Sequence, residues 1–137
     1  MCVPERRATG STVTTARRRV RVVIADDTPA MAAFLEELIR AQGDLELVAV
    51  GRDTTSAIEL ADSHRPDVIV LDVRMPGGGG EVAAAAIRAA SPSVRIVALS
   101  TRSEQEVIAG MLAAGADAYV IKGPDVGEIL GAIRQCP

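Results

Sequence analysis

The sequence predicts an α/β domain in which an open, five-stranded parallel sheet carries helices on both faces, a doubly wound arrangement. Short β-branched runs alternate five times with longer helical patterns between Val20 and about Gln135. Three of the runs, VRVVIA, VIVL and RIVAL, are almost continuously apolar, which is typical of strands buried on both sides. Right-handed crossovers between parallel strands then place helices on the two faces of the sheet.

The strands are expected at 20–25, 45–50, 68–71, 95–99 and 118–121. A chain of 137 residues is long enough for one such domain and too short for a second core. Hydrophobic residues make up 48% of the chain, but aromatic residues are almost absent. The core is therefore expected to be aliphatic, and Phe34 is expected to join it from the apolar stripe of the first helix.

Capping signals mark the helices between these strands. The first helix is expected to begin at Thr28-Pro29, because Pro is tolerated at the first helical position. The second is expected to end before Pro66, and the third to run from near Glu81 to a point before Pro92. The remaining signals are Gly43 after the first helix, Asp53 before the second, Ser103 with Glu106 and then Gly115 around the fourth, and Asp125 with Glu128 at the fifth.

The N-terminal segment 1–19 differs in composition from the rest of the chain. Six arginines and a single acidic residue, Glu5, fall within the first 21 residues, although the whole chain has a net charge of −3. Without apolar periodicity, this segment is expected to be a flexible basic tail, and contact with nucleic acid or an anionic surface is the alternative. The domain is expected to span 20–136, and its acidic body argues against direct nucleic-acid binding.

The chain carries no sign of a membrane or secretory segment. No run of about 18 apolar residues occurs, and no apolar stretch follows Arg6 and Arg7. Cys2 and Cys136 lie at the two ends, where we expect free thiols in a reducing cytosol. A cytoplasmic protein without membrane contact is therefore expected.

Polar residues follow the apolar runs at positions where helix packing gives no reason for them. Asp26 and Asp27 follow the first strand, Asp72 the third, Ser100 the fourth and Lys122 the fifth. The carboxyl ends of parallel strands meet at one edge of a sheet, where doubly wound folds bind ligands. Taken singly, Asp27 or Ser100 could cap a helix, and Lys122 could be a solvated loop residue. Together the five residues predict one site.

Three neighbouring carboxylates repel one another unless a cation lies between them or their pKa values shift. Oxygen ligands without His or Cys suit a hard ion such as Mg²⁺, which would also draw in a phosphoryl donor. Asp72, on the central run, is the natural carboxylate nucleophile. Lys122 offers a positive charge and Ser100 a hydroxyl donor to phosphate oxygens.

On these residues the chain resembles the receiver domains of bacterial two-component response regulators over residues 20–135. The matching features are Asp26-Asp27, Asp72 within LDVRMPG, Ser100, Tyr119, and Lys122 within YVIKG. The resemblance implies a flavodoxin-like, CheY-like fold with strand order 2-1-3-4-5. The segments VRMPG, AAGADAYVIKG and EILGAIR resemble most those of regulators with a helix-turn-helix DNA-binding output domain, which implies an output in transcription.

The resemblance also implies roles for individual residues. Asp72 is the implied phosphoacceptor for a sensor histidine kinase, and Ser100 and Lys122 grip the phosphoryl group. The implied Mg²⁺ ligands are Asp26, Asp27, Asp72 and the backbone carbonyl of Arg74. Ser100 would then move toward the phosphoryl group and Tyr119 would rotate inward, which reshapes the face of the fourth helix, fifth strand and fifth helix. Homodimer formation on phosphorylation is a further implied outcome.

Two alternatives remain at this point. A phosphatase with an Asp nucleophile needs a second Asp two residues further on, where this chain has Arg74, so we expect no enzyme. A receiver-like protein-binding module that is never phosphorylated stays open. The glycines at 77–80 follow the third strand without a Lys-Ser/Thr pair, so they predict a mobile turn rather than a Walker loop.

Overall fold

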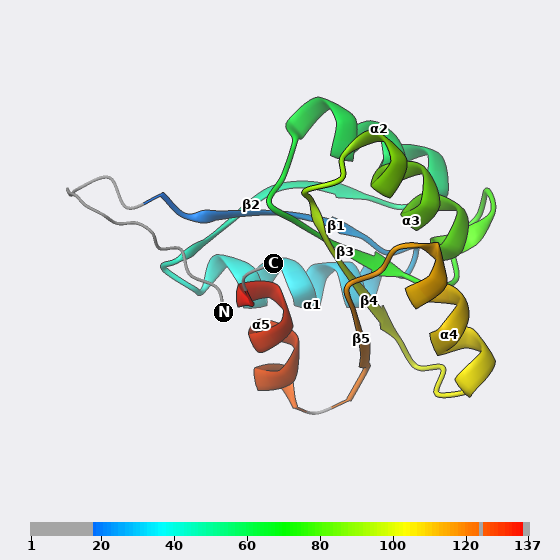
Figure 1. Ribbon diagram of the computed structural model, residues 1–137. Helices are drawn as coiled ribbons and strands as arrows, with labels where there is room; N and C mark the ends of the chain where they lie inside the picture. The colour runs from blue at the N-terminus through cyan, green and yellow to red at the C-terminus, as the bar shows by residue number, and fades with distance from the viewer. Residues whose placement is uncertain (1–17, 124, 136–137) are drawn as a thin grey trace.

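The computed structural model describes residues 18–123 and 125–135, in which strands and helices alternate strictly. The elements are β1 Val20–Ala25, α1 Pro29–Arg40, β2 Leu45–Gly51, α2 Thr54–His64, β3 Val68–Asp72, α3 Gly79–Ala90, β4 Arg95–Ser100, α4 Gln105–Ala114, β5 Ala118–Ile121 and α5 Val126–Arg134. All strand pairs are parallel, in the order β2-β1-β3-β4-β5 (Figure 1). The predicted fold class and strand order are confirmed.

The helices form one layer on each face of the sheet (Figure 1). On one face, Leu35 and Ile39 of α1 and Ile129 and Ile133 of α5 pack against apolar side chains of β1, β3, β4 and β5. On the other, small side chains of α2 and α3, such as Ala83, and the side chain of α4 Met111 pack against β1, β3 and β4. Every residue of β3 and β4 is buried, as the continuous apolar runs predicted.

The predicted N-terminal tail lies mainly outside the described residues, which begin at Arg18. The Arg18 guanidinium donates hydrogen bonds of 3.2 and 2.9 Å to the two carboxylate oxygens of Asp67, just before β3. No helix in the described part of the chain is long and apolar enough to cross a membrane.

Most of the predicted helix boundaries are confirmed. Helix α1 begins at Pro29 with Thr28 as its N-cap, although the Thr28 hydroxyl makes no capping bond, and α2 and α3 end before Pro66 and Pro92. Asp53 caps α2, because its carboxylate accepts a 2.7 Å hydrogen bond from the Ser56 N–H and the Ser56 hydroxyl returns a bond to the Asp53 N–H. Gly115 is the C-cap of α4. The third helix begins at Gly79, two residues before the expected Glu81.

Two other signals were wrong, and a third was right only in part. Gly43 is not the cap of α1, because Ala41 already ends that helix with its N–H bonded to the Glu37 carbonyl. Helix α4 is capped by Glu104 rather than Ser103, since the Glu104 carbonyl accepts the first helical bonds, from Val107 and Ile108. Asp125 is the N-cap of α5, but its side chain makes no capping bond; the Glu128 N–H bonds its backbone carbonyl instead, at 3.3 Å.

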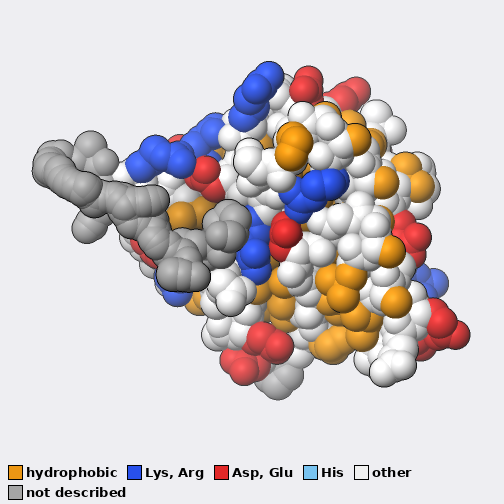
Figure 2. All heavy atoms as spheres, in the orientation of Figure 1, with side chains coloured by type: hydrophobic (Ala, Val, Ile, Leu, Met, Phe, Trp, Pro, Cys, Tyr) orange, Lys and Arg blue, Asp and Glu red, His pale blue; other side chains and the backbone are white. Residues whose placement is uncertain are grey.

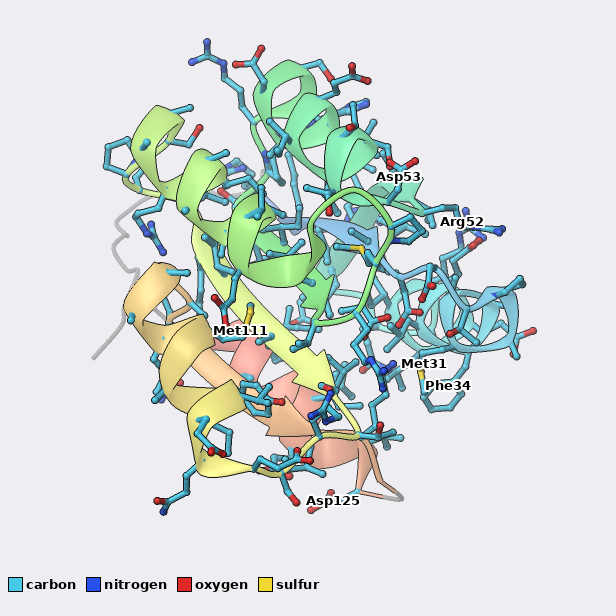
Figure 3. The ribbon with its side chains drawn as sticks, turned by 90° about the vertical axis from the view of Figure 1, so that its right-hand side faces the viewer. Met31, Phe34, Arg52, Asp53, Met111 and Asp125 are labelled. Atoms are coloured by element: carbon cyan, nitrogen blue, oxygen red, sulfur yellow. The ribbon has the colours of Figure 1, made fainter. Side chains whose placement is uncertain are left out.

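Phe34 is not a core residue, contrary to the prediction. Its side chain is 43% exposed on α1, where Figure 3 shows it beside Met31. Successive helical residues are rotated by about 100°. Because Leu35 and Ile39 occupy the buried face of α1, Phe34 is turned away from the sheet.

Apolar side chains also gather over β5, one of the two edge strands, between α4 and α5 (Figure 2). Ile121 on β5 is 39% exposed and Leu112 on α4 is 46% exposed. These side chains border the face of α4, β5 and α5, which the resemblance to receiver domains implies is reshaped by phosphorylation.

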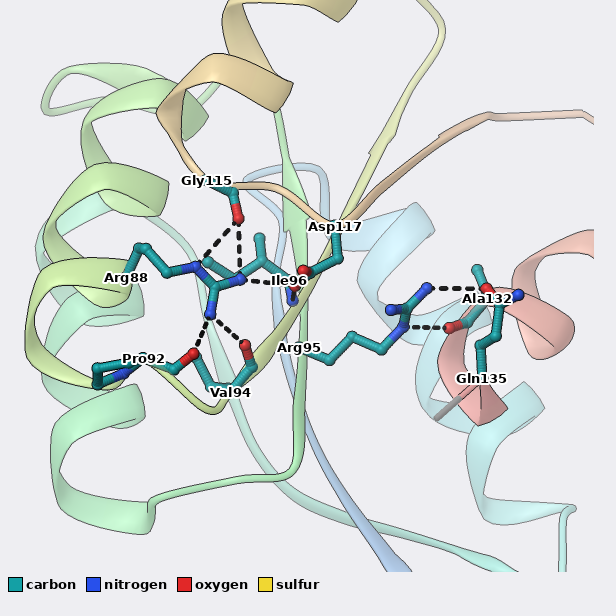
Figure 4. A network of polar contacts seen from close by, with 9 residues as sticks. All are labelled: Arg88, Pro92, Val94, Arg95, Ile96, Gly115, Asp117, Ala132 and Gln135. Atoms are coloured by element: carbon teal, nitrogen blue, oxygen red, sulfur yellow. Dashed lines mark hydrogen bonds and ion pairs between the residues drawn. The ribbon is translucent and has the colours of Figure 1, made fainter. Parts of the chain in front are cut away.

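The guanidinium of Arg88 joins α3 to the segments that precede β4 and β5 (Figure 4). It donates hydrogen bonds of 2.7 Å to the Pro92 and Val94 carbonyls and of 2.9 Å to the Gly115 carbonyl. It also contacts Asp117 at 2.6 Å, and the same Asp117 oxygen accepts a 2.8 Å bond from the Ile96 N–H. This network lies where β4 and β5 begin, at the end of the sheet opposite the predicted site.

Candidate functional site

The register of the parallel sheet brings the predicted site residues to one edge. Ala25 pairs with Leu71, so Asp26 and Asp72 are the next residues on neighbouring strands. Asp72 pairs with Leu99, and Ser100 with Ile121, so Ser100 and Lys122 follow at the ends of β4 and β5. Asp26, Asp72, Ser100 and Lys122 therefore lie side by side along the edge of the sheet, on the neighbouring strands β1, β3, β4 and β5.

The three aspartates form a compact acidic cluster. Oxygen atoms of Asp26, Asp27 and Asp72 all lie within 4.8 Å of one another. Asp26 and Asp72 are almost fully buried, with 1% and 6% of their surface exposed, whereas Asp27 is exposed. Repulsion among these carboxylates is relieved by a positive neighbour or by a raised pKa of one of them.

Lys122 supplies that positive charge. Its Nζ lies 3.2 Å from Oδ2 of Asp26 and 3.4 Å from Oδ1 of Asp72. The strand end fixes its backbone, since the Lys122 N–H donates a 2.7 Å hydrogen bond to the Ser100 carbonyl. Asp26 is held from the other side, because its Oδ1 accepts a 2.9 Å bond from the Thr28 N–H at the start of α1.

The surroundings of Asp72 raise the pKa of its carboxyl group from 3.8 to about 6. Burial is the main cause, followed by the negative charge of Asp26. The Lys122 ammonium and the Arg74 backbone N–H lower the pKa of Asp72 without cancelling the rise. Asp72 is therefore an unusually basic carboxylate at the end of the central strand.

This raised pKa predicts a specific dependence of stability on pH in the absence of Mg²⁺. Between about pH 7 and about pH 4 the folded state binds the proton of Asp72 before the unfolded state does, so the free energy of unfolding should rise as the pH falls, by at most about 3 kcal/mol. Urea unfolding in EDTA across this range checks it. The carboxyl carbon of Asp72, followed by NMR, should titrate near 6, and titration near 3.8 would contradict the prediction.

Ser100 and Tyr119 meet at the loop between β4 and α4. The buried Ser100 Oγ accepts a 3.0 Å hydrogen bond from the Arg102 N–H. The Tyr119 hydroxyl donates a 2.8 Å bond to the Arg102 carbonyl. Both side chains thus bond to the backbone of Arg102, so a movement of this loop would change the hydrogen bonds of both.

The loop after Asp72 is anchored rather than free of partners. The Gly80 N–H donates a 2.8 Å bond to the Val73 carbonyl, and Thr54 at the start of α2 bonds to the Pro76 and Gly79 carbonyls. The four glycines in the sequence predict a mobile turn at this position, and nothing in the sequence near Thr54 indicates its role. No local signal marked Thr54, because its partners lie more than 20 residues further along the chain.

Comparison with known proteins identifies the class of protein that this fold and this acidic site define. The family model of the response regulator receiver domain matches residues 22–134. The chain therefore belongs to the response regulator receiver domain family. Receiver domains in transcription regulators are generally not enzymes.

Among its relatives are regulators of the NarL type. The probable transcriptional regulatory protein NarL of Mycobacterium tuberculosis is 36% identical over 121 residues, which are 86% of this chain and 55% of that protein. The chain thus spans about half the length of this curated relative. The signal receiver domain of the putative response regulator NarL from Mycobacterium tuberculosis has a TM-score of 0.81 and 33% identity, covering 85% of this chain and 94% of that one.

A further solved structure carries a metal. The receiver domain of a sensor histidine kinase from Pseudomonas aeruginosa was solved with a magnesium ion coordinated in its active-site cleft. It has a TM-score of 0.76 and 26% identity, covering 85% of this chain and 95% of that chain.

Proposed function

We propose that this receiver domain accepts a phosphoryl group on Asp72 from a sensor histidine kinase and signals through the resulting change at its surface. The observation that carries the proposal is the Asp72 carboxylate, which is buried between two other aspartates and the Lys122 ammonium. Its raised pKa makes the ionised form a better nucleophile than an exposed carboxylate. Lys122 and Ser100 are proposed to hold phosphoryl oxygens by charge and by hydrogen bonding.

Mg²⁺ fits the donor set at this edge. The three carboxylates offer oxygen atoms within 4.8 Å of one another, the ligand type that Mg²⁺ prefers. We propose that Asp26, Asp27 and Asp72 hold the ion, together with the backbone carbonyl of Arg74. When bound, Mg²⁺ would neutralise charge on the carboxylates and on phosphate oxygens. Asp26 is already fixed by the Thr28 N–H, so the chain holds this ligand in place beforehand.

The switch is proposed to run through Ser100 and Tyr119. A phosphoryl group on Asp72 adds about two negative charges and three strong acceptor oxygens. Movement of Ser100 toward it would release the Arg102 N–H, and the Arg102 carbonyl is the acceptor for Tyr119. Inward rotation of Tyr119 would then alter the face of α4, β5 and α5, where Figure 2 shows apolar side chains gathered.

The relatives of this chain support a proposal for how the signal passes beyond this domain. We propose that the receiver unit spans 20–136, after a basic tail at 1–19, and controls transcription through a DNA-binding output domain, as the NarL-type relatives are regulators of about twice this length. Homodimer formation through the altered face is the proposed consequence of phosphorylation. The receiver unit itself is not proposed to bind nucleic acid.

Incubation with acetyl phosphate and Mg²⁺ tests the proposal. The intact protein should gain the mass of one phosphoryl group, and peptide mapping after borohydride reduction should place it on Asp72. EDTA in place of Mg²⁺ should prevent the gain. A wild-type protein that stays unmodified, both here and with a panel of autophosphorylated histidine kinases, would favour the alternative of a receiver-like binding module that is never phosphorylated.

A further inference from the structure

Thr54 connects the start of α2 to the second half of the loop between β3 and α3 and to the first residue of α3. Its backbone N–H donates a 3.0 Å hydrogen bond to the Pro76 carbonyl. Its hydroxyl donates a 3.1 Å bond to the Gly79 carbonyl, at the first residue of α3. The side chain is 2% exposed, so water does not compete freely for these bonds.

The start of α2, which carries Thr54, is itself held in place. Asp53 and Ser56 form a reciprocal capping box around Thr54, which fixes the first turn of α2. Figure 3 shows Asp53 beside the loop that leads into α3. Any constraint that Thr54 imposes on the loop is therefore transmitted from a fixed helix end.

The loop fits closely against Thr54 and against the end of β3. A Cβ atom on Gly77, which has a φ of +96°, would lie 3.3 Å from the Thr54 Cβ. A Cβ atom on Gly80 would lie 2.7 Å from the Asp72 carbonyl oxygen, so α3 begins in direct contact with the strand end. The absence of a side chain at Gly77 and Gly80 therefore lets the loop lie close to Thr54 and to the end of β3. The hydrogen bonds of Thr54 hold the loop in this position.

Arg74 lies in the first half of this loop, beside the acidic cluster. Its backbone N–H lies near enough to the Asp72 carboxyl group to lower the pKa of that group. Between Asp72 and Gly80 the loop is closed by the bond from the Gly80 N–H to the Val73 carbonyl, and its outer part is held by Thr54. A shift of the Pro76–Gly79 segment would thus move Arg74 relative to Asp72.

We propose that Thr54 is a positioning residue for the acidic site: it fixes the loop so that the Arg74 backbone stays beside Asp72. The inference rests on the proposed function only in taking Mg²⁺ as the probe of the site. Thr54 touches neither the carboxylates nor the proposed phosphoryl group, and it acts through the loop alone.

The test compares Thr54→Val with Thr54→Ser and Thr55→Val in the whole chain. Valine keeps the shape of threonine and removes the hydroxyl donor, serine restores the donor, and the neighbouring Thr55 is exposed. Mg²⁺ affinity is measured by isothermal titration calorimetry, and loop order by hydrogen exchange of the Arg74 and Gly80 amides. Loss of one hydrogen bond that orders a ligand-bearing loop predicts about three- to tenfold weaker Mg²⁺ binding and faster exchange in Thr54→Val.

Thr54→Ser and Thr55→Val should both stay close to wild type in the two measurements. A Thr54→Val protein that unfolds at lower temperature yet binds Mg²⁺ with unchanged affinity and unchanged loop exchange would overturn the positioning role. A wild type that binds no Mg²⁺ would overturn the proposed metal site instead. The exchange rates of the Arg74 and Gly80 amides would then decide alone whether Thr54 holds the loop.

Discussion

Replacing Asp72 with Asn is expected to abolish phosphoryl uptake and, in the absence of Mg²⁺, to stabilise the folded domain. Asn has no nucleophilic carboxylate, so the mass gain with acetyl phosphate should disappear. It also removes one of three clustered negative charges while keeping the shape of the side chain. Because the pKa of Asp72 is raised to about 6, its ionised form opposes folding at neutral pH, and the variant should gain about 1–3 kcal/mol in free energy of unfolding.

The same variant should respond differently to Mg²⁺. An ion that binds only the folded state stabilises it according to its concentration and affinity. The wild type should therefore unfold at higher urea concentration with Mg²⁺ than with EDTA, whereas Asp72→Asn should show a much smaller difference. Urea unfolding of both proteins under both conditions measures the four free energies.

Asp62→Asn is the matched control, because Asp62 is an exposed aspartate on α2, away from the strand ends. It should leave stability, Mg²⁺ response and phosphoryl uptake close to wild type. An Asp72→Asn protein that is less stable than wild type in EDTA would show that Asp72 contributes favourable contacts that outweigh its charge repulsion. Retained phosphoryl uptake by this variant would place the acceptor elsewhere.

The acidic site could be predicted from sequence because it depends on local order. Each of Asp26, Asp72 and Lys122 directly follows an apolar strand, and parallel pairing brings those strand ends together whatever the helices do. The fold followed from the same alternation of short and long patterns. Phe34 was assigned wrongly, because an apolar residue beside the buried stripe of α1 looks the same in the sequence as one within it.

The long-range hydrogen bonds that hold the surrounding loops and strands could not be predicted from local sequence patterns. Thr54 bonds a carbonyl 25 residues away, and Arg88 bonds groups 27 and 29 residues away. Backbone carbonyls carry no sequence signature, so nothing local indicates that a threonine or an arginine will meet them. The capping box predicted at Asp125 is absent for a related reason, since the backbone carbonyl of Asp125 accepts the Glu128 N–H bond that its side chain was expected to accept.

Arg88→Met is expected to cause a large loss of stability, although Arg88 lies outside the site. The guanidinium bonds the carbonyls of Pro92, Val94 and Gly115 and pairs with Asp117, while its side chain is only 26% exposed. Methionine keeps much of the aliphatic stem but leaves these acceptors without their donor. Loss of such a part-buried network predicts a decrease of about 2–4 kcal/mol in free energy of unfolding. Urea or thermal unfolding measures the decrease.

Arg88→Lys should fall between the wild type and Arg88→Met, because an ammonium keeps the charge near Asp117 but cannot reach three carbonyls in the planar geometry of guanidinium. Arg40→Met is the matched control. Arg40 is 66% exposed and makes one i, i+4 ion pair of 3.2 Å with Glu36, so its loss should cost less than about 0.5 kcal/mol. An Arg88→Met protein no less stable than Arg40→Met would contradict the structural role of the network.

The position of the network separates its effect on stability from the chemistry at the site. Arg88 acts where β4 and β5 begin, whereas Ser100 and Lys122 lie where the same strands end. At a temperature where Arg88→Met is still fully folded, phosphoryl uptake on Asp72 should therefore proceed close to the wild-type rate. Asp72→Asn should behave in the opposite way, with higher stability and no uptake. Measured side by side, the two variants would show that the opposite ends of the sheet have separable tasks, because one end holds the strands together and the other carries the reactive carboxylate.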